Sequence, residues 1–396
     1  MTDHSLQIQS IYARQVLDSR GTPTVEVEVA LRGGAVGRAI VPSGASTGQA
    51  EALELRDGDP HDYAGKSVRR AVANVTAVLA PPLIGMDATQ QTQIDETMLT
   101  LDGTPNKARL GANALLGVSL AVAHAAAAGQ QMPLYRYLGG DKATLVPMPM
   151  VNILSGGLHA GGAVDMQDYL AIPIGAPDYA TALHWLSRVR KATGELLAQD
   201  GYEAVLVAHE GGYGPRLPDN EAGLRYLTQA IERAGLRPAE DVAIALDVAS
   251  THFYQDERYH FAVEERAMSA AELVERLADW VERYPIISIE DGLAEEDWVG
   301  WRRLTQWLGR IQLLGDDLFV TNPARLQAGI DLGVANAVLI KFNQVGTLTE
   351  TVQTVRLAQA RGYNPVISAR SGETEDTTIA DLAVATRAGQ IKVGSL

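Results

Sequence analysis

The sequence predicts an α/β protein in which a barrel of repeated strand–helix units follows a smaller α+β domain. Its 396 residues exceed one small domain and suit one large domain with a second, smaller one. After about Leu145, short apolar runs alternate with amphipathic helical segments, a pattern typical of a parallel sheet closed into a barrel. Residues 1–138 instead show strands followed by helices, which predicts a separate domain, with the boundary to residues 139–396 near Gly139 and Gly140.

Composition excludes several classes of protein. Apolar residues make up 46% and charged residues 20% of the chain, enough for a sizeable core and too apolar for a disordered protein. The net charge of −15 argues against nucleic acid as a partner. The absence of cysteine excludes disulfides, thiolate zinc sites and cysteine nucleophiles. The polar first ten residues show no signal-peptide pattern, so we expect a cytoplasmic protein.

In the N-terminal part, valines alternate with Glu26 and Glu28 over residues 24–31, which predicts a half-buried strand. A glycine pair at 33–34 then turns the chain into a second strand over residues 36–41. Residues 42–48 form a flexible loop, and helical patterns follow. The most apolar of these, residues 114–128, is short for a membrane span of about 20 residues. We therefore expect a buried core helix ending at Gly129, and no membrane partner.

The C-terminal part contains seven short apolar runs that we expect to be strands. They are residues 205–207, 242–248, 286–289, 311–314, 337–340, 365–367 and Ile391. Helix start signals lie between several of them: Ser269 with Glu272, and Thr347 with Glu350, have the spacing of capping boxes. A doubly wound sheet is the weaker alternative, because no glycine-rich dinucleotide fingerprint follows a strand.

An ionisable residue lies at or just after the end of each apolar run. These residues are Glu210, Asp247, Glu290, Asp316, Lys341, Arg370 and Lys392. One such residue is usually a helix cap or a solvated loop residue. Seven at successive strand ends favour one site, because the C-terminal ends of barrel strands converge on the face where active sites form.

The residue types at these strand ends predict a magnesium site. Asp247, Glu290 and Asp316 offer hard oxygen ligands, which suit Mg²⁺ rather than Zn²⁺. Three negative charges overcompensate one divalent ion, so a cationic neighbour is expected, and Lys341 and Lys392 supply it. A lysine near Mg²⁺ and other cations loses its proton more readily, so it can act as a base near neutral pH. Mg²⁺ beside such a lysine can stabilise an enediolate formed from a carboxylate substrate.

Two further features point to an anionic substrate held under loops. Arg370 and Ser371 precede a helix expected to start near Thr377, and offer a forked cation and a hydroxyl to a phosphoryl group. Glycine pairs at 156–157, 161–162 and 211–212 are either mobile lids that exclude water or plain turns.

Long stretches around these residues resemble the enolase (phosphopyruvate hydratase) family. The matching segments are residues 13–21, 42–48, 111–114, 288–291, 315–318 and 370–377. The resemblance covers nearly the whole chain and implies a modified eight-stranded enolase-type barrel with an N-terminal α+β lid domain. It also implies a homodimer or higher homo-oligomer, two Mg²⁺ ions, and a small anionic phosphorylated or phosphonylated carboxylate as ligand.

The resemblance also implies a role for each matching residue. Asp247, Glu290 and Asp316 would bind the first Mg²⁺, and Ser46 would help to bind the second. Lys341 would remove the proton alpha to the carboxylate, and Glu210 would act as acid on the leaving group. The remaining substrate-binding residues would be Lys392 at the carboxylate, Arg370 and Ser371 at the phosphate, and His159, Gln167 and Asp168 nearby.

Four positions depart from the family pattern, all in substrate-facing loops. Ala369 replaces a pocket histidine, His209 replaces an aspartate, Leu158 replaces a serine, and Asp168 replaces a glutamate. The chain stops at Leu396, so we expect it to lack the family's C-terminal helix. Losing a positioned donor such as the histidine can lower general acid–base catalysis by about 10²–10⁴-fold.

Three functional hypotheses follow. The first is a specialised Mg²⁺-dependent paralogue that forms a phosphoenolpyruvate-type enol ester by alpha-proton abstraction and elimination on a 2-phosphoglycerate-like substrate. Carboxyphosphonoenolpyruvate synthase of phosphonate (phosphinothricin-type) biosynthesis is one branch that would suit the extra room beside Ala369. The second is an ordinary glycolytic enolase that converts 2-phosphoglycerate to phosphoenolpyruvate, and the third is a non-catalytic enolase-like binding protein.

Overall fold

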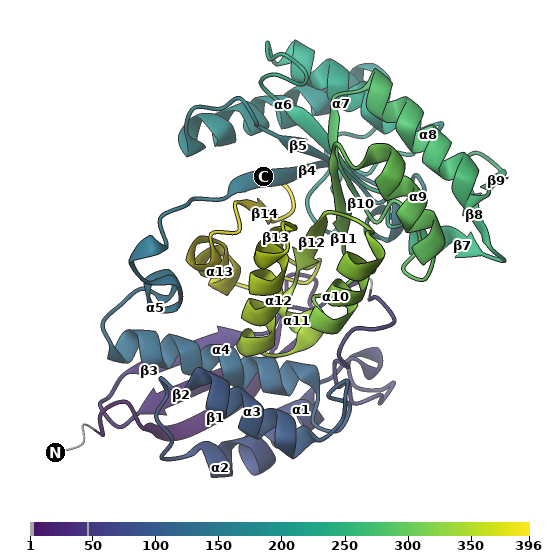
Figure 1. The fold of residues 1–396 in the computed structure, drawn as a ribbon. Helices are drawn as coiled ribbons and strands as arrows, with labels where there is room; N and C mark the ends of the chain where they lie inside the picture. The colour runs from purple at the N-terminus through teal and green to yellow at the C-terminus, as the bar shows by residue number, and fades with distance from the viewer. Residues whose placement is uncertain (1–3, 46) are drawn as a thin grey trace.

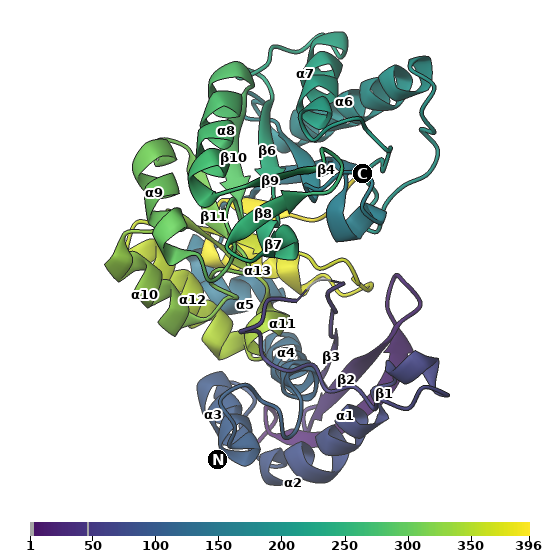
Figure 2. The same ribbon diagram turned by 90° about the vertical axis from the view of Figure 1, so that its right-hand side faces the viewer.

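The computed structural model describes residues 4–45 and 47–396, which form an N-terminal α+β domain beneath a closed barrel (Figures 1 and 2). The N-terminal sheet is antiparallel, in the order β1 (Ile8–Leu17), β2 (Pro23–Leu31) and β3 (Val36–Ile40). Its helical elements are η1 (Tyr63–Gly65), α1 (Arg69–Asn74), η2 (Val75–Leu79), α2 (Ala80–Leu83), α3 (Gln91–Asp102), α4 (Ala112–Gly129), α5 (Leu134–Gly139) and η3 (Gly140–Lys142).

The two predicted N-terminal strands are present as β2 and β3, and β1 was not predicted. The prediction of a half-buried β2 was wrong in one respect, because Glu26 is only 2% exposed. Arg14 and Arg38, from the strands on either side, pair with its carboxylate at 2.8 and 2.5 Å. Buried charges are tolerated when they are paired in this way.

The apolar helix α4 is the core of the N-terminal domain, as the sequence predicts. Among the described residues it is the one helix long and apolar enough to span a membrane, but 83% of that window is buried inside the protein. It packs on β2 and β3. Gly37 of β3 allows the close approach, because a Cβ there would lie 2.1 Å from the backbone nitrogen of Ala125.

The C-terminal part is a closed eight-stranded barrel with helices outside it (Figure 1). The barrel order is β10 (Ile286–Glu290), β11 (Gln312–Gly315), β12 (Ala337–Ile340), β13 (Asn364–Ser368), β14 (Gln390–Lys392), β4 (Met148–Ser155), β5 (Asp168–Ile172) and β6 (Ala243–Asp247). The surrounding helices are α6 (Tyr179–Gln199), α7 (Glu221–Arg233), α8 (Ala270–Arg283), α9 (Trp298–Leu308), α10 (Pro323–Leu332), α11 (Phe342–Val345), α12 (Leu348–Ala360) and α13 (Thr378–Thr386).

Short elements complete the loops of the barrel domain. They are η4 (Gly157–Ala160), η5 (Ser250–Phe253), and a three-stranded sheet of β7 (Tyr254–Gln255), β8 (Arg258–Phe261) and β9 (Arg266–Met268). Small and branched apolar side chains fill the barrel interior, as its packed core requires. They include Met150, Leu170, Ile172, Ala245, Leu314, Leu339 and Val366.

The predicted barrel is confirmed, with two corrections to its strands. Six of the seven predicted runs are barrel strands, but residues 205–207 are an exposed loop, in which Val205 is 84% exposed. The barrel is instead closed by β4 and β5, which were not predicted. The predicted parallel arrangement also has one exception, because β5 runs antiparallel to both β4 and β6. This reversal brings the start of β5, at Asp168, beside the end of β6, at Asp247.

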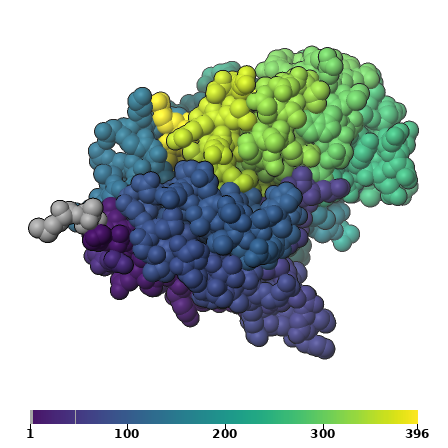
Figure 3. Space-filling view, turned by 60° about the horizontal axis from the view of Figure 1, so that its bottom comes forward, coloured from purple at the N-terminus to yellow at the C-terminus, as the bar shows by residue number. Residues whose placement is uncertain are grey.

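The N-terminal domain packs directly on the helices that cover one side of the barrel. Helix α4 contacts α11 and α12, and α5 packs on α13. Figure 3 shows the blue surface of this domain in close contact with the yellow-green surface of the C-terminal part of the chain. Lys107, 4% exposed, extends from the N-terminal domain to Glu350 of α12, with 2.9 Å between Nζ and Oε1.

Candidate active site

The three predicted metal-binding carboxylates lie together at the mouth of the barrel, the C-terminal end of its strands. Asp247 ends β6 and Glu290 ends β10, and the two are register partners in adjacent parallel strands. Asp316 follows the neighbouring strand β11 by one residue. All three are buried. Their convergence follows from strand register, because equivalent positions of adjacent parallel strands are neighbours.

Two lysine ammonium groups form ion pairs with these three carboxylates. Lys392, at the end of β14, places its Nζ 2.9 Å from Asp247 Oδ2 and 2.8 Å from Glu290 Oε2. Lys341, after β12, is hydrogen-bonded to the Asp316 carboxylate. Burial opposes the charged form of both lysines, but the carboxylates outweigh it, and the pKa of Lys392 lies well above its usual range.

The ammonium group of Lys341 is stabilised by its carboxylate neighbour. Burial lowers the pKa of Lys341, but Asp316 raises it above its usual value, although Arg370 opposes that rise. The same contact lowers the pKa of Asp316, against the opposing effect of burial. The physical reason is that each lysine here supplies the positive charge that balances the acids.

The donor set fits a hard divalent cation. Asp247, Glu290 and Asp316 are carboxylates, and no thiolate competes for the ion. Gln167 donates to Asp247 over 3.4 Å, while its Oε1 is buried without a hydrogen-bond partner. Because an unpaired buried acceptor is costly, this oxygen suits a water molecule or a substrate hydroxyl. Ser46, the residue predicted to bind a second ion, lies outside the described residues.

A second acidic group lies next to Asp316. Oxygen atoms of Asp291, Asp316 and Asp317 come within 4.8 Å of one another, and all three residues are buried. Asp291 accepts hydrogen bonds from the backbone nitrogens of Asp316 and Asp317, at 2.9 and 2.8 Å. Burial, followed by the charge of Asp316, raises the pKa of Asp317 to about 8. Asp291 and Asp317 lie in the segments 288–291 and 315–318 that resemble the family, but neither residue was predicted to have a role in the site.

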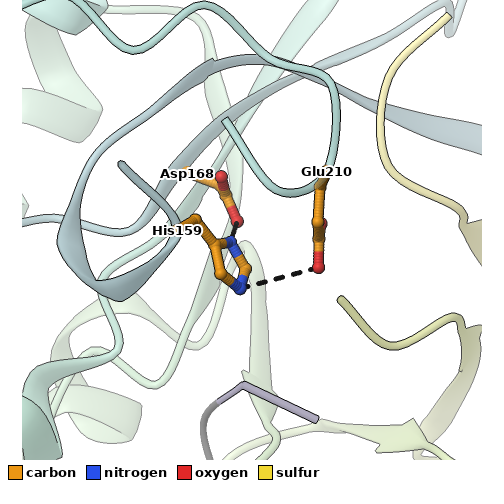
Figure 4. Close-up of side chains that lie close together, drawn as sticks. All are labelled: His159, Asp168 and Glu210. Atoms are coloured by element: carbon orange, nitrogen blue, oxygen red, sulfur yellow. Dashed lines mark hydrogen bonds and ion pairs between the residues drawn. The ribbon is translucent and has the colours of Figure 1, made fainter. Parts of the chain in front are cut away.

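His159, Asp168 and Glu210 form a third cluster, from three separate segments of the chain (Figure 4). His159 Nδ1 lies 2.8 Å from Asp168 Oδ2, and its Nε2 lies 3.6 Å from Glu210 Oε1. Burial would lower the pKa of His159, but the charge and hydrogen bond of Asp168 raise it to about 9. Burial, then the charge of Asp168, raises the pKa of Glu210. The cluster therefore contains a charged histidine and a carboxyl group that favours its protonated form.

Asp168 is held by a local network as well as by His159. It is fully buried at the start of β5, and its Oδ1 accepts hydrogen bonds from Asn152 and Ser155 of the neighbouring strand β4. Three polar contacts leave the carboxylate little freedom to rotate. The substitution of glutamate by aspartate at this position therefore keeps a negative charge directly beside His159.

The predicted phosphate-binding residues are buried at the mouth and already have protein partners. Arg370 donates to Glu51 at 3.1 and 3.3 Å and to Asn343 at 3.1 Å. Ser371 Oγ accepts from Arg20 at 3.2 Å and from the backbone nitrogen of Ala45 at 2.7 Å. The sequence analysis missed Glu51 and Arg20 as site residues, although both lie in or beside segments that resemble the family.

Arg20 joins the N-terminal loop to the barrel mouth. It donates to Ser43 Oγ at 2.8 Å and to Asp18 Oδ2 at 3.1 Å, as well as to Ser371. The backbones of Ser43 and Gly372 also exchange two hydrogen bonds of 2.9 Å. The loop therefore reaches the mouth through contacts between residues more than 300 positions apart.

One small pocket brings most of the predicted residues together. Its lining residues are His159, Gln167, Glu210, Asp247, Lys341, Ser368, Ala369, Arg370, Ser371 and Lys392. Glu290, Asp316 and Asp168 lie behind this surface and contact its members. Of the altered positions, Ala369 lines the pocket, whereas Leu158, 48% exposed, and His209, also exposed, are not among its lining residues.

A closed α/β barrel that gathers carboxylates, lysines and a histidine at its mouth, next to an α+β domain, defines a member of the enolase superfamily. The model of the enolase N-terminal domain matches residues 8–138, and that of the enolase C-terminal TIM barrel domain matches residues 143–396. The chain therefore belongs to the enolase family. Proteins of this family typically use Mg²⁺, and the acidic groups at the mouth agree with that.

Proposed function

We propose that this enolase-family protein is a Mg²⁺-dependent lyase that acts on a 2-phosphoglycerate-like carboxylate. The observation that carries the proposal is that a lysine and a glutamate, Lys341 and Glu210, line one pocket together with Arg370, Ser371 and Lys392. Elimination next to a carboxylate needs a base at one carbon, an acid at the leaving group, and cations for the substrate's charges.

In the proposed reaction, Lys341 Nζ removes the proton from C2, beside the carboxylate. The electron pair of the broken C2–H bond first moves into the carboxylate to give an enediolate, and it forms the C2=C3 double bond when the C3–O bond breaks in a second step. The leaving hydroxyl takes a proton from Glu210 and departs as water. Burial favours the protonated form of Glu210, which suits a general acid. Lys392 and Arg370 would hold the carboxylate and the phosphoryl group.

Asp247, Glu290 and Asp316 would hold the ion. When bound, Mg²⁺ would supply positive charge that stabilises the substrate carboxylate as C2 loses its proton, and would engage Asp316 in place of Lys341. The protein's own contribution is to keep Lys392 within 2.9 Å of Asp247, so that the cations of the pocket stay close to the acids.

The Lys341→Ala variant tests this proposal. With 2-phosphoglycerate and Mg²⁺ in D₂O, the wild-type protein should exchange the C2 proton and form an enol product, measured by proton NMR and ultraviolet absorbance. Lys341→Ala should lower proton exchange by about 10²–10⁴-fold. Lys191→Ala, at an exposed position of α6, is the control. Unchanged exchange in Lys341→Ala would refute Lys341 as the base.

We further propose that the pocket is specialised for a substrate larger than 2-phosphoglycerate at the leaving-group side. Ala369 is buried and lines the same pocket as Glu210 and Lys341, and its methyl group is smaller than the imidazole that the family resemblance implies at this position. A phosphonate-bearing enol ester of the carboxyphosphonoenolpyruvate type is one product that would use this space.

The Ala369→His variant tests the specialised function. It should raise turnover of 2-phosphoglycerate relative to the wild-type protein, because it restores a donor in the pocket, an effect of about 10-fold or more. If the wild-type protein already turns over 2-phosphoglycerate rapidly and Ala369→His changes little, the ordinary enolase reaction is the better assignment.

A further inference from the structure

Arg190, on the outer helix α6, makes an unusually complete set of contacts with loops of the site. Its Nε donates to Ser395 Oγ over 3.1 Å and its Nη2 donates to the carbonyl of Gly211 over 3.1 Å. Its guanidinium also lies over the ring of Tyr213, with the Cζ 4.7 Å from the ring centroid. Arg190 does not line the pocket, so any effect on chemistry must act through these neighbours.

The neighbours of Arg190 are chain segments that carry pocket residues. Gly211 directly follows Glu210, and Ser395 lies three residues after Lys392. The two segments are joined to each other, because the backbone nitrogen of Ser395 donates to the carbonyl of Glu210 over 2.7 Å. Arg190 therefore hydrogen-bonds to both of the segments that this contact joins, one carrying Glu210 and the other carrying Lys392.

The other supports of the Glu210 loop are backbone hydrogen bonds: His209 donates to the carbonyl of His159 over 3.2 Å, and Ala208 and Gly211 donate within the loop over 2.8 and 3.0 Å. Residues 205–207, which precede it, are not in a strand and are 84%, 65% and 54% exposed. Among the interactions of the described residues, the Glu210 carboxylate has one ion-pair partner, His159, whose Nε2 lies 3.6 Å from Glu210 Oε1. A loop with little buried apolar surface has low local stability, so a small number of hydrogen bonds can decide its position.

The chemistry of arginine suits this role. Its planar guanidinium can donate to two acceptors in fixed directions and stack on an aromatic ring at the same time, which a lysine ammonium group cannot do. Gly194, on the same face of α6, leaves room for the arrangement, because a Cβ there would lie 2.7 Å from Tyr213 Oη.

We propose that Arg190 is a positioning residue that holds the loop of Glu210 in place for proton donation to the leaving group. This role rests on the proposed function of Glu210. Lys341 has no contact with the Arg190 network among the interactions of the described residues. Lys392 lies closer to that network, but its ammonium group is held by its own ion pairs with Asp247 and Glu290. Loss of Arg190 should therefore impair elimination and leave removal of the C2 proton nearly unchanged.

The test compares Arg190→Gln and Arg190→Lys with a matched control. Arg188→Gln removes another guanidinium of α6, one that donates to the carbonyl of Ala234 and not to the site loops. Each full-length variant is given 2-phosphoglycerate and Mg²⁺ in D₂O, and both C2-proton exchange and product formation are followed by NMR. Amide hydrogen exchange of residues 208–213 and 393–396 is measured in the same proteins.

Arg190→Gln should lower product formation by about 10–10²-fold while C2-proton exchange stays within about 2-fold. Arg190→Lys should fall in between, and Arg188→Gln should match the wild-type protein. Amides of both segments should exchange faster in Arg190→Gln. Unchanged product formation, or an equal fall of both rates, would overturn the proposal, as would unchanged amide exchange.

Failure of the proposed function gives a different result. In that case the wild-type protein itself would show neither C2-proton exchange nor product with 2-phosphoglycerate. The amide-exchange comparison then still decides whether Arg190 holds the loop of Glu210, because it needs no substrate.

Discussion

At the residue scale, Asp168 decides the charge of the His159–Glu210 cluster. It is fully buried and hydrogen-bonded to His159 over 2.8 Å, and it raises the pKa of both neighbours. The histidine is held charged and the glutamate is biased toward its protonated form by the same carboxylate. One buried side chain can therefore prepare two others for different roles in proton transfer.

Asp168→Asn should lower the pKa of His159 from about 9 toward the ordinary value of 6.5, because the opposing charge is lost while burial remains. The titration of the His159 ring, followed by NMR, measures this. Asp165→Asn, which alters a carboxylate bonded to Asn220 and not to His159, is the control. A His159 pKa that stays near 9 in Asp168→Asn would contradict the assignment.

The same pair predicts a pH dependence of stability. A histidine whose pKa is raised on folding stabilises the protein fully below its unfolded pKa of 6.5, and this contribution is lost as the pH rises through about 9. The contribution is on the order of 3 kcal/mol at most. The free energy of unfolding, measured with urea, should fall between pH 6 and pH 9.5. This fall should be smaller for Asp168→Asn than for the wild-type protein.

At the element scale, strand direction and helix caps determine which side chains reach the mouth. The antiparallel strand β5 starts at Asp168, so its first residue lies at the mouth, whereas the parallel strands contribute their last residue or the residue that follows it. Among the helices, α8 begins with the capping box that the sequence predicts: Ser269 accepts from the backbone of Glu272, and Glu272 accepts from the backbone of Ser269. This cap defines where the chain leaves β9.

Ser269→Ala should reduce the free energy of unfolding by about 1 kcal/mol, because two backbone donors at the start of α8 lose their partners or their geometry. Urea unfolding measures the change. Ser187→Ala, at an exposed position inside α6, is the matched control and should change stability by less than about 0.5 kcal/mol. Equal effects of the two substitutions would contradict a capping role.

At the scale of the whole molecule, the site is completed by contact between the two domains. Arg20 and Ser43 of the N-terminal domain bond to Ser371 and Gly372 at the barrel mouth, and Glu51 pairs with Arg370. The backbone nitrogen of Gln49 also donates to Glu295, over 3.2 Å. Because the loop lies against the acidic mouth, binding of a cation there should stabilise both domains together.

Mg²⁺ should therefore raise the thermal unfolding midpoint, and EDTA should reverse the effect. Binding at 100 times the dissociation constant adds about 2.7 kcal/mol of stability. Asp316→Asn should remove most of the increase, whereas Asp331→Asn, on the exposed side of α10, should retain it. A midpoint that does not respond to Mg²⁺, measured by calorimetry with and without 2-phosphoglycerate, would contradict the magnesium assignment.

Much of the fold followed from local patterns. The alternation around Glu26 and Glu28 predicted β2. Six continuous apolar runs predicted barrel strands, because a strand that is buried on both faces is apolar at successive positions. The prediction of a strand at residues 205–207 failed because three successive apolar residues satisfy the same pattern without being buried. In the structure they are 84%, 65% and 54% exposed. Strand β4 was not predicted because Asn152 interrupts its apolar run, whereas β5 has a continuous apolar run, residues 169–172, from which a strand could have been predicted.

The sequence by itself determined the residue types of the site and their positions near strand ends, because strand ends can be located from apolar runs and the loops that follow them. Its resemblance to the enolase family identified the same residues, and their individual roles remain predictions. Only the tertiary structure decided the partners: Lys392 between Asp247 and Glu290, Asp168 against His159, and Arg190 across Gly211 and Ser395. The physical reason is that these contacts depend on barrel closure and strand direction, which bring together residues far apart in the chain.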